Sequence, residues 1–299
     1  MASTSAVESA QPGNWVRPRN SIFAILHELW ESRELLFQFV QRDLTVRYAQ
    51  AVMGFAWALL MPVLIVGAGL VFRVVLVTLS GAPLDGADVA SLAVKSLPWA
   101  FFSGGLSIAT QSVIANANLL GKIYFPREAL PIATVIAQCT DLGIGLALLL
   151  AIVPFLGMHV TLNAFFGLLI LALLVVFTAG CALLLSCANL FYRDVKYIVQ
   201  VILSFGVFAT PVFFEPQMLG PKGARLLLAL PLSPFIQALD IAVVRGHSLF
   251  STIVLPSRKG NVVVWSPWLL GYAVASSCVL FAAGLLVFRA QSGRFAEMA

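Results

Sequence analysis

Six long apolar runs, separated by short polar segments, constrain the fold of this chain more than any other feature of its sequence. Charged residues make up 10% of the 299 residues and the mean hydropathy is +0.97, whereas about a quarter of the residues of a soluble domain are charged. Each bilayer crossing takes about 20 mainly apolar residues. The sequence therefore predicts an all-α polytopic membrane protein with a six-span transmembrane domain at 52–288. The expected transmembrane helices are 52–73, 97–118, 131–156, 163–189, 198–214 and 267–288.

The segment between the fifth and sixth spans is long, from residue 215 to residue 265. It contains two apolar pieces, Leu226–Leu230 and Phe235–Val244, which are too short to cross a bilayer. Lipid tolerates such backbone only where protein or water satisfies its polar groups. We therefore expect re-entrant or surface helices in this segment, which forms an outer gate loop at 215–265.

The N-terminal part of the chain divides into two segments. Residues 1–20 are polar and lack an apolar core, so we expect a disordered cytoplasmic tail and no cleaved signal peptide. Residues 21–48 are expected to form an amphipathic interface helix with its lead-in, because apolar residues recur with helical period. Such a helix lies along the membrane surface; packing on the protein's own loops is the alternative. The apolar face holds Ile22, Ile25, Leu26, Leu29, Leu36 and Val40, and the polar face holds Glu28, Glu31, Glu34 and Gln38.

The distribution of Lys and Arg predicts the orientation of the chain. Cytoplasmic loops carry an excess of these residues, and most of them fall on one side when both termini are placed in the cytoplasm. Residues 289–299 then form a second cytoplasmic tail, and Arg73 ends the first span at the outer interface, where its side chain can snorkel. The cytoplasmic set is Arg17, Arg19, Arg33, Arg42, Arg47, Lys122, Arg127, Arg193, Lys196, Arg289 and Arg294; the outer set is Lys95, Lys222, Arg225, Arg245, Arg258 and Lys259.

Two kinds of partner are not expected. The formal net charge of +5 does not indicate nucleic-acid binding, because the basic residues are scattered or gather at span ends. No metal site is expected, since the cysteines lie in apolar runs without metal-ligand spacing and the histidines are isolated. The cysteines are Cys139, Cys181, Cys187 and Cys278.

A charged loop between the second and third spans, residues 120–131, has more charged, aromatic and proline residues than a passive turn requires. Its two prolines fix backbone angles, and aromatic side chains adjoin charged ones. Aromatic anchors inside a charged border concentrate the energy of small interfaces, so we expect this loop to bind another protein; aromatic side chains at the headgroup level are the alternative. Arg193 and Asp194 form a second candidate contact. The expected contact residues of the loop are Lys122, Tyr124, Phe125, Pro126, Arg127 and Glu128.

Charged residues also stand next to and inside the predicted spans. The guanidinium groups of Arg42 and Arg47 suit phosphate, because each planar fork donates two hydrogen bonds, and Asp43 and Tyr48 accompany them. This segment could bind lipid phosphate, a lipid carrier or another subunit, or it could be an ordinary positive anchor. Asp141 lies inside the third span, where a carboxylate is costly unless it is paired. It is either a functional group or a structural hydrogen-bond partner of a neighbouring helix.

Several motifs follow one another in a fixed order from about residue 30 to the C-terminus. They are Arg42–Tyr48, Gly54–Trp57 with Pro62, Tyr124–Glu128 with Leu130–Pro131, Asp141, Tyr192–Val195, Thr210–Val212, Pro231–Phe235 and Phe295–Glu297. Together they resemble the ABC-type permeases that export polysaccharides such as O-antigens, capsules and teichoic acids. Thr45, Ala49 and Leu230 depart from the family pattern, which commonly has lysine at the first two positions and asparagine at the third.

The resemblance implies a half-transporter of the bacterial cytoplasmic (inner) membrane. Two copies would pair as a homodimer above two separate ATPase subunits, which would bind ATP and Mg²⁺, so the permease itself would be no enzyme and would bind no cofactor. The substrate would be a lipid-linked glycan, and Arg42–Tyr48 would contact the ATPase or the lipid carrier. In agreement, the sequence lacks the G-x-x-x-x-G-K-[ST] phosphate loop. An ABC permease for drugs or small lipids, a secondary transporter and a membrane glycosyltransferase are the alternatives.

Aromatic residues gather toward the outer halves of the predicted spans. Sugar rings stack their C–H faces on aromatic rings, so these side chains could line a channel for a glycan; ordinary interfacial belt residues are the alternative. The expected channel residues are Trp99, Phe101, Phe102, Phe208, Phe213 and Phe214, together with Asp141.

Overall fold

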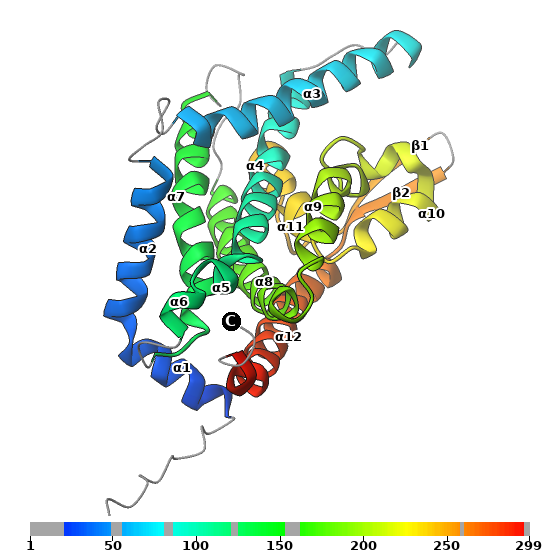
Figure 1. The fold of residues 1–299 in the computed structure, drawn as a ribbon. Helices are drawn as coiled ribbons and strands as arrows, with labels where there is room; N and C mark the ends of the chain where they lie inside the picture. Colours follow the sequence, from blue (N-terminus) through cyan, green and yellow to red (C-terminus); the bar gives the residue numbers. More distant parts are fainter. Residues whose placement is uncertain are drawn as a thin grey trace, which may run out of the picture.

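The computed structural model describes residues 21–48, 56–80, 86–120, 125–152, 162–257 and 260–295, most of which are helical (Figure 1). The predicted tail at 1–20 and the loop residues Lys122 and Tyr124 lie outside these ranges. The helices are α1 (Ile22–Glu31), α2 (Arg33–Tyr48), α3 (Ala56–Ser80), α4 (Gly86–Ala109), α5 (Ser112–Ala115), α6 (Ala117–Leu120), α7 (Ala129–Ile152), α8 (Ala164–Phe191), α9 (Val195–Gly206), α10 (Pro216–Ala229), α11 (Ser233–Leu239) and α12 (Pro267–Gln291). Short 3₁₀ turns cover Val207–Ala209 and Ser292–Arg294, a π-helical turn covers Asp240–Val244, and the strands are β1 (Ile253–Ser257) and β2 (Gly260–Trp265).

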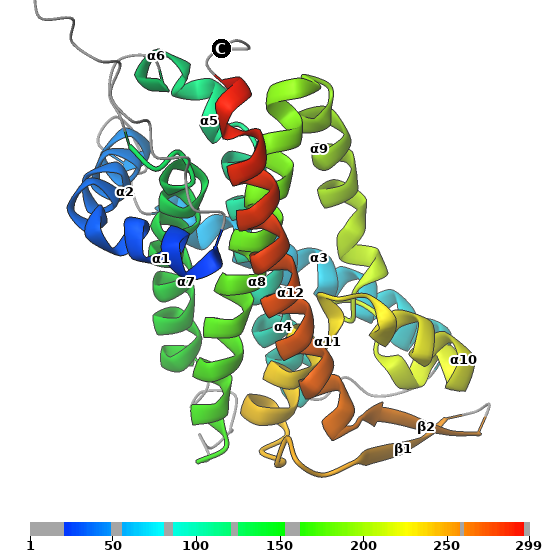
Figure 2. The same cartoon turned by 90° about the horizontal axis from the view of Figure 1, so that it is seen from below.

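Helices α4, α7, α8 and α12 pack side by side as the centre of the molecule (Figures 1 and 2). Their shared core is apolar and includes Phe101, Ile170 and Leu174, none of which is more than 1% exposed. The closest approach is between α8 and α12, where Gly180 faces Gly284. A Cβ atom at Gly180 would lie 2.6 Å from the backbone carbon of Leu280. Small residues let helices pack this closely inside a membrane.

Among the described residues, three helices are long and apolar enough to cross a membrane: Ala129–Ala151, Ala164–Phe191 and Pro267–Gln291. They coincide with the predicted third, fourth and sixth spans. A bent pair, Pro216–Ala229 with Ser233–Val244, meets the same test as one broken span or a re-entrant loop, with a bend of 111°. The helical membrane protein is confirmed. The count of six spans stays a prediction, because the apolar parts at Val63–Val75 and Val195–Ala209 are shorter.

The predicted second span is wrong in its position. Helix α4 runs from Gly86 to Ala109, whereas the expected span was 97–118. Asp88 and Lys95 made its first half look like a loop. Lys95 is only 1% exposed and its ammonium lies 3.5 Å from the carboxylate of Asp240, so it belongs to the protein interior and not to an outer loop.

The segment 215–265 holds the bent helix pair and an antiparallel β-hairpin (Figure 2). The re-entrant or surface helices expected there correspond to α10 and α11. The hairpin was not predicted, although Val262 and Val264 alternate with Val263 as a half-buried strand requires. Val262 and Val264 are buried against Ala224 of α10, while Val263 is exposed.

Both ends of the described chain pack more closely than expected. Ile25 of α1 is fully buried, whereas Phe23 and Trp30 are 84% and 70% exposed. The interface helix therefore packs on its own protein with one face, next to α12, and offers aromatic side chains on the other. The tail expected from residue 289 begins inside α12, and Phe295 is fully buried.

We predict that Gly180→Val destabilises the protein by about 1–3 kcal/mol, because an added side chain has no room between α8 and α12. Thermal unfolding of the detergent-solubilised chain measures the effect. Gly271→Val is the matched control, since a Cβ atom at Gly271 of α12 would meet nothing within 4 Å. Equal loss of stability in both variants would contradict the close α8–α12 contact.

Candidate functional site

Two adjoining cavities form one groove along α4, with α2 and α7 on one side and α9 on the other. The cavities measure about 510 Å³ and about 570 Å³. Both are lined by Arg47, Ser107 and Ile108, which marks the place where they meet. Ile65 of α3 and Phe101 of α4 also face the first cavity. The groove is therefore a continuous candidate site.

The groove carries many neutral hydrogen-bonding groups. Hydroxyl and amide side chains come from α4, α5, α7 and α9, together with the short connections next to α5. They are Ser103, Ser107, Gln111, Ser112, Asn116, Thr134, Gln138, Gln200 and Ser204. Gly104 leaves room beside Gln138, because a Cβ atom there would lie 3.0 Å from its amide nitrogen.

Asp141 pairs with two residues that the sequence had assigned to a different segment. Arg47 donates hydrogen bonds to the carboxylate of Asp141 at 2.9 Å and to the amide oxygen of Gln138 at 2.8 Å. Tyr48 donates to the other carboxylate oxygen. Burial and the hydrogen bond to Asp141 raise the pKa of Tyr48 to about 12, so the phenol keeps its proton at neutral pH. These bonds fasten the end of α2 to the middle of α7.

Arg42 and Asp43 also pair within the chain. Arg42 contacts Asp43 at 2.9 Å and donates to the side-chain oxygen of Asn116 at 2.7 Å. The hydroxyl of Thr134 donates to Asp43 at 3.0 Å. Each guanidinium that lines the groove thus has a carboxylate beside it. Because their positive charges are paired, Arg42 and Arg47 attract a phosphate less strongly than the sequence suggested. The pairing favours an uncharged polar ligand.

The described half of the loop 120–131 is anchored inside the protein. Phe125 is 7% exposed and its ring packs 5.5 Å from that of Phe39. Glu128 is fully buried, and burial raises the pKa of its carboxyl despite the nearby Arg289. Pro126 is buried as well. These side chains make internal contacts and are not available to a partner, so the role of the loop as a binding surface stays a prediction.

Arg289 connects the end of α12 to α1 and to the loop 120–131. Its guanidinium contacts Glu128 at 3.3 Å and also pairs with Glu28 of α1. Arg127 donates to the backbone oxygen of Ser292 and lies 5.9 Å from the ring centre of Phe295. The loop, α1 and the end of α12 are therefore mechanically linked.

The second candidate contact lies on the surface. Arg193 and Asp194 are exposed in the turn between α8 and α9. The buried Asn189, which the sequence analysis did not single out, fixes this turn. It accepts from the backbone nitrogen of Lys196 at 3.1 Å and donates to the backbone oxygen of Thr110 at 3.0 Å. A buried amide near a helix end is the pattern that could have indicated it.

The aromatic side chains expected in a channel have different surroundings. Trp99, Phe101 and Phe213 are buried at 5%, 1% and 6% exposure, and Phe208 is 50% exposed. Phe101 lines the groove. The others pack on neighbouring aromatic rings: Phe208 lies 5.2 Å from Phe213, Phe214 lies 5.0 Å from Phe72, and Phe102 lies 5.9 Å from Phe177. Their role in a channel stays a prediction.

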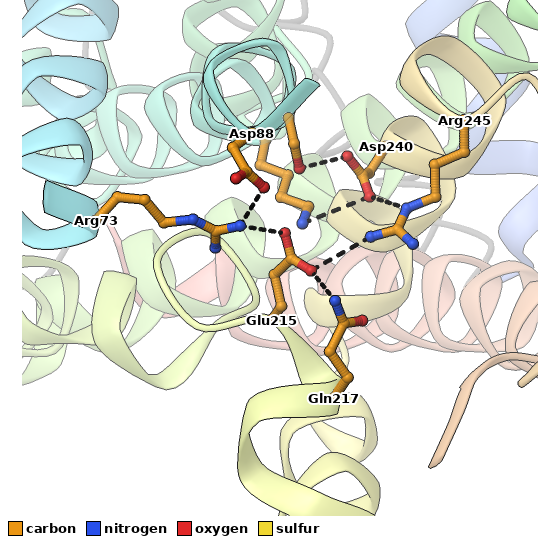
Figure 3. A network of polar contacts seen from close by, with 8 residues as sticks. Arg73, Asp88, Glu215, Gln217, Asp240 and Arg245 are labelled. Carbon is orange, nitrogen blue, oxygen red and sulfur yellow. Dashed lines mark hydrogen bonds and ion pairs between the residues drawn. The ribbon is translucent and has the colours of Figure 1, made fainter. Parts of the chain in front are cut away.

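A second polar cluster joins residues of α3 and α4 to residues next to α10 and α11 (Figure 3). Asp240 is fully buried and contacts Ser91 at 2.6 Å, Arg245 at 3.1 Å and Lys95 at 3.5 Å. Lys95 was expected on the outer side of the membrane, but it is a buried partner of Asp240. Asp240 and Lys95 each stand in an apolar stretch of the sequence, and this position could have indicated that each has an oppositely charged partner.

The rest of this cluster is centred on Glu215, which is 6% exposed. One carboxylate oxygen lies 3.3 Å from Arg73 of α3 and the other lies 3.4 Å from Arg245. Gln217 also donates to Glu215, and Arg73 pairs with Asp88 of α4 (Figure 3). Arg73 was expected to snorkel at the interface; it is 9% exposed and ion-paired instead.

The sequence profile of the ABC-2 type transporter family matches residues 34–244. This chain belongs to the ABC-2 type transporter family. It is 27% identical over 275 residues to the O-antigen export system permease protein RfbA of Myxococcus xanthus, with 91% of this chain and 98% of that protein covered. It is 24% identical over 266 residues to a protein of the same name from Klebsiella pneumoniae, with coverage of 89% and 95%.

Membership in the family gives the chain a role without bond-making chemistry. ABC-2 proteins of this kind are permease subunits of ABC transporters, and this chain is accordingly a multi-pass membrane permease. The groove, the cluster around Glu215 and Asp240, and the ion pairs of Arg289 are thus parts of a transport protein.

We predict that Asp141→Ala lowers stability by about 1–3 kcal/mol, because it leaves Arg47 and Tyr48 without their charged partner. Thermal unfolding of the solubilised chain measures this. Glu34→Ala removes an exposed carboxylate of α2 and serves as the control, with a change within about 0.5 kcal/mol. Unchanged stability of Asp141→Ala would show that the α2–α7 contact does not depend on the ion pair.

Proposed function

We propose that this chain is the transmembrane, channel-forming subunit of an ATP-driven exporter that moves a lipid-linked polysaccharide across the bacterial cytoplasmic membrane. The observation that carries the proposal is the groove, with its hydroxyl and amide lining and paired charges. The names of the relatives add a substrate class, since both are O-antigen export permeases.

The lining mixes hydroxyl and amide groups with apolar side chains such as Ile65 and Leu97, and both kinds of group can contact a carbohydrate. Sugar hydroxyls both donate and accept, as do the hydroxyl and amide groups of Ser107, Gln138 and Gln200. Phe101 offers a ring on which a sugar face can stack. Exchangeable hydrogen bonds of this kind guide a polymer past many equivalent positions without holding it at one of them.

A second copy of the chain would complete the path. Helix α9 buries Val199 and Leu203 but exposes Ile198, Val201, Ile202 and Phe205 at 57–68%. Gln200 and Ser204 of the same helix line the groove. Pairing of two copies near α9 would cover apolar surface and enclose the polar lining, which supports a homodimer.

ATP hydrolysis is assigned to two separate cytoplasmic ATPase subunits, which bind ATP and Mg²⁺. The loop 120–131, with Lys122, Tyr124 and Arg127, and the exposed Arg193 and Asp194 would contact them. Motion of the loop would reach α1 and α12 through Glu128 and Arg289. This end of the molecule, with both termini, would therefore face the cytoplasm.

The interface helix would place the lipid part of the substrate. Phe23 and Trp30 are exposed and suit the headgroup region of membrane lipid. Arg42, Asp43, Arg47 and Tyr48 stand where this helix meets the groove. They would contact the lipid carrier or the ATPase when the glycan enters.

We predict that Ser107→Trp stops export by filling the junction of the two cavities, while the ATPase still co-purifies and hydrolyses ATP. Export of lipid-linked glycan from cells that lack the native permease measures this. Val279→Trp is the matched control, because Val279 of α12 is 65% exposed and lies outside the groove. Normal export by Ser107→Trp would refute the groove as the glycan path.

A further inference from the structure

The charge cluster around Glu215 lies at one end of the groove. Three elements contribute to both sites, and on each of them the cluster follows the groove in the same direction. On α3, Arg73 lies beyond Ile65; on α4, Lys95 and Asp88 lie beyond Leu97; after α9, Glu215 lies beyond Ser204. At 1.5 Å of rise per residue, about 18 Å of helix axis separate Lys95 from Ser107. The cluster thus stands across the groove's end on the hairpin side.

The cluster has a fixed half and a more accessible half. In the fixed half, the side chains of Asp240 and Lys95 are 0% and 1% exposed, and Asp240 also holds Ser91 and Arg245. In the other half, the side chains of Arg73 and Asp88 are 11% and 25% exposed. Glu215 bridges the halves, because it contacts Arg73 with one oxygen and Arg245 with the other.

Withdrawal of Glu215 would leave each of its cations with a carboxylate. Arg73 would keep Asp88, and Arg245 would keep Asp240. Removing a buried charge's last partner is strongly unfavourable, so a closed cluster usually resists separation. Here Arg73 and Arg245 each have a second carboxylate, which lowers the cost of moving Glu215. Both cations therefore stay paired whether Glu215 is in place or withdrawn.

The aromatic residues just before Glu215 also hold this segment in place. Phe213 and Phe214 pack on Phe72 of α3, with ring centres 6.2 Å and 5.0 Å apart. Phe213 also lies beside Gly69, whose added Cβ would be 3.2 Å from its ring. The segment that carries Glu215 is therefore seated on α3 by both aromatic and ionic contacts.

We propose that Glu215 is the release point of a charged lock that closes the groove at the hairpin end. Arg73 and Arg245 hold Glu215 in the closed state, and Asp88 and Asp240 retain these cations when Glu215 leaves. Glu215 and Asp88 are positioning residues for transport. They act in opposite directions, because Glu215 closes the exit and Asp88 stabilises Arg73 after opening. The proposal rests on the function proposed above for the groove.

The test compares Glu215→Gln with Asp88→Asn in the full chain. In liposomes that contain the chain, leak of radiolabelled sucrose reports on the closed state without any glycan or ATP. We expect Glu215→Gln to raise the leak about tenfold, which corresponds to ~1.4 kcal/mol. Asp88→Asn should leave the leak at the unmodified level, because Arg73 keeps Glu215. Glu31→Gln removes an exposed carboxylate at the opposite end and is the control.

The second measurement is ATP-driven glycan export by the complex of the chain with its ATPase. Asp88→Asn should slow export about tenfold at normal thermal stability, because opening then leaves Arg73 without its reserve partner. If Glu215→Gln does not fold, Glu215→Asp keeps the charge on a shorter side chain and should give a smaller rise in leak.

Two results would overturn the lock. Leak from both Glu215 variants at the unmodified level would show that the cluster closes nothing. Equal losses of stability and export in Glu215→Gln and Asp88→Asn, with equal leak, would make the cluster a plain structural support. Failure of the unmodified complex to export any glycan would refute the proposed function alone, since the sucrose leak still decides on the lock.

Discussion

The cost of placing charge in an apolar surrounding is the constraint on which the rest of this structure depends. A buried ion loses its hydration and is tolerated when an opposite charge and further hydrogen bonds replace it. Arg47 with Asp141 and the cluster around Glu215 and Asp240 satisfy this requirement, and Arg289 pairs with two glutamates. Each set also joins elements that are far apart in the sequence.

These ion pairs explain how the mostly apolar helices of this chain acquire a defined arrangement. Apolar packing alone specifies position weakly in lipid, because lipid tails offer helices similar contacts. The ion pairs fix α2 on α7, Glu215 on α3, Asp240 on α4, and α1 on α12. The first of these ion pairs, Arg47 with Asp141, lines the groove, whose other lining residues mix hydroxyl and amide groups with apolar side chains.

The sequence predicted the membrane class, three long spans and the family, because hydrophobic length and motif order are local properties. It also singled out Arg47, Tyr48 and Asp141, but as two separate candidates. Lys95 and Asp240 were missed, since a charge reads as a loop until its partner is known, and that partner lies on another helix. The hairpin was missed although Val262, Val263 and Val264 alternate, because its buried face packs on α10, a helix that the sequence does not place beside these strands.

We propose that this permease moves its substrate only when a separate ATPase drives it. The direct measurement is passage of lipid-linked glycan across liposomes that contain the purified chain, with and without the ATPase and ATP. The account predicts no passage by the chain alone and passage when both additions are present. Passage at the full rate through the chain alone would contradict it.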